Sequence, residues 1–173
     1  RHGIFRDVPG LEPDAMIEVS SPSAPDAFRV VGGKDKPRIR IGDLKRRVNG
    51  NHRYEIGYPL NIGFEGDRVS WNAIGTEWDL KIAQVEIHLL APVAFEEVRA
   101  TKGLFGSWDG VEVAQVEPGH LVVSVDELDH NEGVTISARM TGQLEVAPAQ
   151  PVARSVLEND PGMGVFGLFV TAM

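Results

Sequence analysis

Hydrophobic and polar residues alternate over several short segments, and this alternation is the strongest structural signal in the chain. The clearest segments are residues 38–41, 54–58, 85–89, 111–113 and 134–138. A period of two is typical of a β-strand with one buried face, whereas a helix needs a period near 3.6. Turn-forming pairs such as Asn49-Gly50 separate the segments. The pattern therefore predicts an all-β chain of mostly antiparallel strands.

Strands with one solvated face must bury the other face, so the pattern predicts a two-sheet β-sandwich with few or short helices. Closure of one sheet into a barrel is the alternative that the sequence leaves open. Residues 95–101 are the best helix candidate, although they also fit a strand. Large aromatic side chains are expected to anchor the core, namely Phe5, Tyr54, Phe64, Trp71 and Phe105.

The composition is that of one folded domain. The chain has 173 residues, of which 42% are hydrophobic and 24% charged, values close to those of globular proteins. A net charge of −8 argues against a nucleic-acid partner, because phosphate binding needs a positive surface. The chain contains no cysteine, which excludes disulfides and thiolate chemistry.

Four short signatures follow one another along the chain. They are GIFRDVP at residues 3–9, IRIGD at 39–43, HRYEIGY at 52–58 and WNAIGTEW at 71–78. In this order and at this spacing they resemble the N-terminal extracytoplasmic domain of a bacterial family of predicted membrane proteins, domain of unknown function 2207. The resemblance covers about residues 1–145. It implies a location at the bacterial cell membrane, on the extracytoplasmic side, and it implies no chemistry.

The resemblance and the composition together suggest three segments. Residues 1–146 are expected to form the β-sandwich ectodomain, truncated at its N-terminus because family members carry a signal peptide and further strands before the first signature. Residues 147–162 are expected to form a Pro-rich linker. Residues 163–173 carry no charge and are expected to begin a transmembrane helix, which needs about 20 residues in all. A last core strand or a tail is the alternative.

Two tryptophans are the candidates for ligand binding. Trp78 and Trp108 flank predicted turns, where an exposed indole face could stack on a sugar ring. Trp71 lies at an inward position of its alternating segment and is interpreted as part of the core.

An acidic loop at residues 126–132 is the candidate metal site. It holds four carboxylates and a histidine, and calcium takes six to eight oxygen ligands. The candidate ligands are Asp126, Asp129 and Glu132. Their order does not match an EF-hand, so a solvated turn is the preferred interpretation and no cofactor is predicted.

No catalytic residue is predicted. The histidines are scattered without a zinc-binding spacing, and His52 is expected to form structural hydrogen bonds at the start of a strand. Glu96 and Glu97 are adjacent and would point to opposite faces of a strand, which does not suit a glycosidase pair. A G-x-G-x-x-G pattern at residues 162–167 lacks the helix and the acidic residue of a dinucleotide site.

The sequence therefore predicts a binding, sensing or structural module rather than an enzyme. Its partner would be an unidentified protein or glycan at the cell surface, and the membrane would be reached through a following transmembrane segment. The alternative is an envelope enzyme, such as a glycan hydrolase built from carboxylates distant in sequence.

Overall fold

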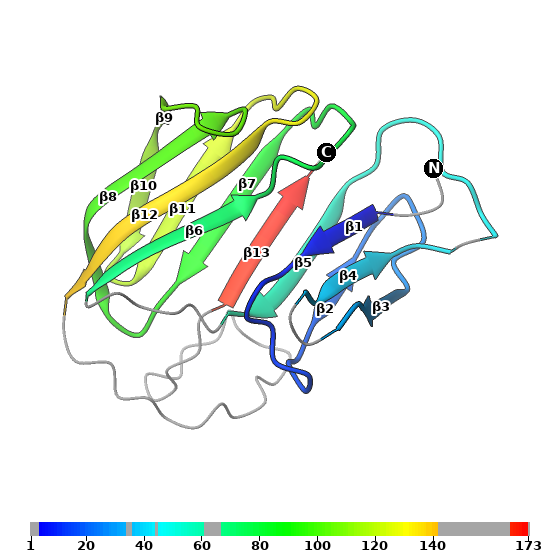
Figure 1. Cartoon of the computed structure of the whole chain (residues 1–173), viewed down its shortest axis with the longest axis horizontal. Coiled ribbons are helices and arrows are strands. Elements are labelled where there is room, and N and C mark those ends of the chain that lie inside the picture. Colours follow the sequence, from blue (N-terminus) through cyan, green and yellow to red (C-terminus); the bar gives the residue numbers. More distant parts are fainter. Residues whose placement is uncertain (1–3, 34–35, 44, 61–66, 142–166, 173) are drawn as a thin grey trace.

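The computed structural model describes residues 4–33, 36–43, 45–60, 67–141 and 167–172. Within these residues the chain forms thirteen strands and no helix (Figure 1). Every strand pairing is antiparallel. The all-β, antiparallel prediction is confirmed.

The strands hydrogen-bond into three sheets rather than two. The smallest sheet has the order β1-β4-β3 and is separate because its strands pair only with one another. Its strands are β1 (Ile4–Asp7), β4 (Arg38–Ile41) and β3 (Phe28–Val31).

The largest sheet has six strands in the order β10-β11-β7-β13-β5-β2. These strands are β10 (Val113–Glu117), β11 (His120–Val125), β7 (Val85–Leu90), β13 (Gly167–Ala172), β5 (Tyr54–Pro59) and β2 (Glu18–Ser20). Figure 1 shows β13, in red, lying between β5 and β7.

The third sheet has four strands in the order β6-β12-β8-β9. These strands are β6 (Arg68–Ile74), β12 (Gly133–Thr141), β8 (Ala94–Gly103) and β9 (Asp109–Val111). Together β6, β12 and β8 form a long, continuous face, and both of these neighbouring pairs contain one register shift.

Four of the five alternating segments correctly located strands. Segments 38–41, 54–58, 85–89 and 134–138 all lie within strands. Segment 111–113 is not one strand, because Val111 pairs with Ala100 of β8 whereas Val113 pairs with Val123 of β11. The chain therefore passes from one sheet to another at this point.

The helix candidate at residues 95–101 is instead part of β8. This strand contains a bulge at Glu97, which has a φ of 49° and lies where the register with β12 shifts. The bulge brings both Glu96 and Glu97 to Arg139, with side-chain N···O distances of 2.6 and 3.1 Å. The prediction that these two carboxylates point to opposite faces is therefore wrong.

One buried cluster draws residues from all three sheets. Tyr54 and Trp71 belong to it, as predicted. Phe5 is 46% exposed because β1 turns Arg6 inward, and Phe105 is 94% exposed in the loop after β8. The prediction that Phe5 and Phe105 anchor the core is therefore wrong, and Phe64 lies outside the described residues.

The apolar C-terminal segment contributes a strand to the largest sheet. Residues 167–172 form β13, which pairs with both β5 and β7. This corresponds to the alternative in which the apolar segment is a last core strand. No helix in the described part of the chain has the length and apolar character needed to cross a membrane. The predicted linker at residues 147–162 lies outside the described residues.

Candidate functional site

A shallow hollow of about 290 Å³ lies on the outer face of the four-stranded sheet. The floor of the hollow is formed by side chains at strand positions that alternate with buried residues such as Trp71 and Ile136. Strand register arranges the floor in two rows, each of which crosses β6, β12 and β8. The first row is Asn72, Thr135 and Thr101, and the second is Ser70, Ser137 and Arg99.

The loop between β8 and β9 forms the rim of the hollow. Its apolar side chains are open to solvent, with Leu104 60%, Phe105 94% and Trp108 82% exposed. The loop folds tightly back on Gly103, which has a φ of 126°. A Cβ at this position would lie 2.5 Å from the Ser107 hydroxyl oxygen. Glycine therefore allows the loop to hold Trp108 beside the sheet.

The electrostatic character of the hollow differs from that of the chain. Its described lining includes Arg99 and Lys102 and contains no aspartate or glutamate, although the net charge of the chain is −8. The Lys102 ammonium lies 3.4 Å from the backbone carbonyl of Glu127. Hydroxyl, amide and cationic groups thus line the hollow, beside an exposed indole.

The two candidate tryptophans lie in different environments. Trp108 is at the rim of the hollow, whereas Trp78 is half-buried and packs against the core. The Trp78 carbonyl accepts a hydrogen bond of 2.9 Å from the backbone N–H of Asn131. Only Trp108 is placed to contact a ligand in the hollow.

The acidic loop is a compact turn with internal hydrogen bonds. The backbone N–H of Asp129 donates to the Glu132 carboxylate at 2.8 Å, and that of Glu132 donates to the Asp129 carbonyl at 3.1 Å. Glu127 forms an ion pair of 2.7 Å with Lys81. Among the described residues, no group of three or more histidine and carboxylate side chains is arranged to hold a metal ion.

We expect calorimetric titration of the chain with calcium to show no saturable binding up to low-millimolar concentration. The reason is that Glu132 is already engaged by the Asp129 N–H, and the loop lacks convergent oxygen ligands. A binding isotherm that disappears in Asp126→Ala or Asp129→Ala would contradict this expectation.

Two histidines that are distant in sequence lie in contact on the largest sheet. The Nδ1 atom of His88 is 3.0 Å from the Nε2 atom of His120. The pKa of His120 is lowered mainly by burial and, to a smaller extent, by the charge of the nearby His88. This contact could not be predicted from the sequence alone, because recognising it requires knowing that β7 and β11 are neighbours and in which register they pair.

His52 lies at the entry to β5. Its Nε2 atom is 3.1 Å from the carbonyl oxygen of Asn49, and its Nδ1 atom is 3.3 Å from the hydroxyl oxygen of Ser23. Both partners belong to the loops around the strand start. These contacts fit the structural role that the sequence suggested.

The four sequence signatures meet at a junction of the three sheets, centred on Arg6. Arg6 is buried and donates to the Tyr58 hydroxyl at 3.2 Å and to the Asn72 backbone carbonyl at 3.1 Å. The next residue, Asp7, forms a bidentate pair with Arg38, which directly precedes the second signature. This pairing lowers the pKa of Asp7. The signatures thus stabilise the fold rather than form an open site.

Comparison with known families supports the resemblance carried by these signatures. A family model described as predicted membrane protein (DUF2207) N-terminal domain matches residues 1–140. No curated protein matches the chain, and no solved structure matches it. The matched residues include the whole Arg6 junction and the hollow on the four-stranded sheet. The chain therefore belongs to the family of predicted membrane proteins defined by this N-terminal domain.

Proposed function

We propose that this chain is the extracytoplasmic binding module of a membrane protein and that it recognises a glycan at the hollow of the four-stranded sheet. The observation that carries the proposal is the exposed indole of Trp108 beside two rows of polar side chains. The family description supports attachment to a membrane. A transmembrane segment after the domain would provide this attachment.

The chemistry of the hollow suits a sugar better than an apolar ligand. An exposed aromatic ring offers apolar area at little conformational cost, and it can cover the C–H face of a sugar ring. Hydroxyl and amide groups on the floor both donate and accept hydrogen bonds, as sugar hydroxyls do. Arg99 adds a rigid fork of donors that favours glycans carrying carboxylate or phosphate groups.

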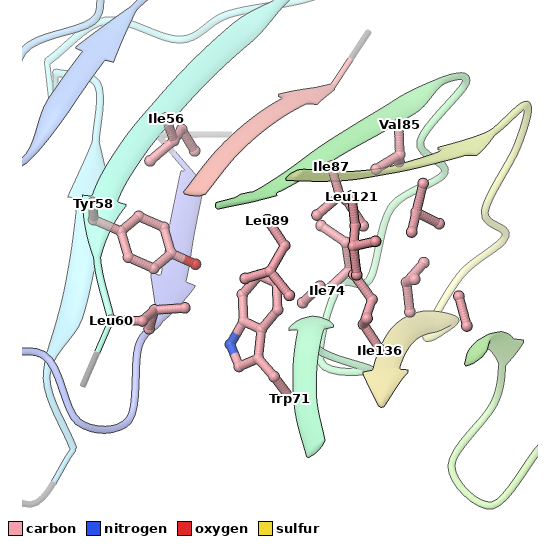
Figure 2. Packing of buried hydrophobic residues seen from close by; sticks show 14 of the residues in the cluster. Ile56, Tyr58, Leu60, Trp71, Ile74, Val85, Ile87, Leu89, Leu121 and Ile136 are labelled. Carbon is pink, nitrogen blue, oxygen red and sulfur yellow. The ribbon is translucent and has the colours of Figure 1, made fainter. Parts of the chain in front are cut away.

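The scaffold beneath this face is inferred to be a β-sandwich. Figure 2 shows Ile87, Leu89 and Leu121 of the six-stranded sheet beside Trp71 and Ile136 of the four-stranded sheet. Side chains from two sheets that share one core are typical of face-to-face packing. Such packing would leave the outer face of β6, β12 and β8 free to bind a ligand on a rigid base.

Recognition, rather than catalysis, is proposed for this face. Glycan hydrolysis uses two carboxyl groups flanking the scissile bond, and the described lining of the hollow supplies hydroxyl, amide and cationic groups instead. The nearby Glu96 and Glu97 are both engaged by Arg139. These contacts favour a binder over the alternative of an envelope hydrolase.

The proposal is tested by titrating residues 1–173 with solubilised cell-wall glycan fragments, both neutral and anionic. We expect Trp108→Ala to weaken binding by about tenfold or more, as for truncation of an aromatic residue that dominates an interface. Trp108→Phe should retain part of the affinity because it keeps a ring. Arg99→Ala should weaken binding of anionic fragments only.

Phe28→Ala provides the control, because Phe28 is an exposed aromatic on β3, outside the hollow. This substitution should leave glycan binding unchanged. Wild-type affinity in Trp108→Ala, or equal losses in Phe28→Ala and Trp108→Ala, would overturn the proposal.

A further inference from the structure

The six-stranded sheet carries a second cluster of polar side chains on its outer face, away from the hollow. His88 on β7 and His120 on β11 alternate with the buried residues Ile87, Leu89 and Leu121. His88 pairs with Val122, and His120 pairs with Leu90, so the two histidines are diagonal neighbours on the same face. Their side chains are 28% and 19% exposed.

The side chains of four ionisable residues form a row across this face. The Glu86 carboxylate is 2.9 Å from Nε2 of His88, and Nδ1 of His88 is 3.0 Å from Nε2 of His120. The Nδ1 atom of His120 is then 3.8 Å from the Glu117 carboxylate. Each imidazole therefore has a carboxylate at its far nitrogen and the other imidazole at its near nitrogen.

This order indicates where the proton of His88 lies. A carboxylate only accepts hydrogen bonds, so Glu86, at 2.9 Å, favours the proton on Nε2 of His88. Glu117 lies 3.8 Å from Nδ1 of His120, and its negative charge attracts a cation to that ring. A neutral imidazole has one N–H group, so Nδ1 of His88 is left with a lone pair that faces Nε2 of His120. At 3.0 Å this lone pair can accept the Nε2 proton of His120 or bind a metal ion held between the two rings.

His120 can bind a metal through Nε2 when the ring carries its proton on Nδ1. A neutral imidazole nitrogen is the usual histidine ligand for zinc, copper and nickel. Carboxylates on the far nitrogens orient such ligands and raise their basicity.

We propose that His88 and His120 bind one zinc-type divalent transition-metal ion between Nδ1 of His88 and Nε2 of His120, with Glu86 and Glu117 orienting the rings. Two nitrogen ligands of a tetrahedral zinc ion lie about 3.3 Å apart. The observed separation of 3.0 Å needs to open only slightly. The pair supplies two protein ligands, and water would complete the coordination.

The test uses residues 1–173, stripped of metal with a chelator and then titrated with zinc chloride in a calorimeter. We expect one saturable site with micromolar affinity that is lost in His88→Ala and in His120→Ala. Glu86→Gln should weaken zinc binding by about 10- to 100-fold, the usual effect of removing such an orienting partner. His52→Ala removes a histidine elsewhere in the chain and should leave binding unchanged.

Nuclear magnetic resonance of the wild-type histidine rings provides a readout that does not depend on the folding of any variant. Zinc should shift or broaden the ring signals of His88 and His120, and it should leave those of His52 in place. The proposal is overturned if zinc shows no saturable binding or if the ring signals respond to pH but not to zinc. In the second case the cation between the rings is a proton.

Discussion

Replacing Trp71 with alanine is expected to lower the free energy of unfolding by about 3 to 5 kcal/mol, as for other large aromatic side chains truncated to alanine in a protein core. Trp71 is 8% exposed on β6 and pairs with Ile136 of β12. Figure 2 shows Leu89, from the six-stranded sheet, directed toward its indole ring. The substitution would thus leave a cavity where two sheets share their core.

Denaturant unfolding monitored by circular dichroism measures this loss. Trp108→Ala is the matched control, because it removes the same side chain from a position that is 82% exposed. Its effect should stay within about 0.5 kcal/mol, as for most surface substitutions. Equal unfolding midpoints for wild type and Trp71→Ala would show that the indole is not part of the core.

Trp71 also illustrates why much of the fold could be predicted from the sequence. Its segment alternates with a period of two, and in a strand this period directly determines which side chains are buried. The same reasoning correctly identified the buried positions Ile39, Ile87 and Ile136. A local pattern was sufficient here because each strand needs only to bury one face.

The sequence failed where a residue's environment depends on a distant partner. Phe5 was expected inside because it is aromatic, yet Arg6 is buried instead and the Phe5 ring lies beside the Arg38 guanidinium. Arginine is rarely buried without partners, and its partners Tyr58 and Asn72 come from other sheets. Alternation alone cannot supply that information. Phe105 was likewise misplaced because hydrophobicity does not separate a core anchor from the exposed rim of a hollow.

The candidate sites likewise depend on partners that are distant in sequence. Trp108 was a candidate because it flanks a turn, and the structure places it at the rim of the hollow. The floor comes from three strands whose register no local pattern reveals. His88 and His120 were seen only as scattered residues, since 32 positions separate them.

Replacing Arg6 with alanine is expected to destabilise the fold about as strongly as Trp71→Ala. Arg6 is 5% exposed, and its guanidinium links β1 to Tyr58 of β5 and to the backbone of β6. Its removal would leave the buried Tyr58 hydroxyl and the Asn72 carbonyl without this donor, at a cost of about 1 to 3 kcal/mol each. The packing of the long Arg6 stem would also be lost. A total of about 3 to 5 kcal/mol is therefore expected.

Arg29→Ala and Arg6→Lys distinguish this mechanism from a general effect of losing a cation. Arg29 is exposed on β3 of the same small sheet, so its replacement should change the free energy of unfolding by no more than about 0.5 kcal/mol. Lysine keeps the charge at position 6 but lacks the planar fork that reaches two acceptors at once, so an intermediate loss is expected. If Arg6→Ala unfolds at the same denaturant concentration as Arg29→Ala, then Arg6 does not hold the three sheets together, and the four signatures that meet there need another explanation.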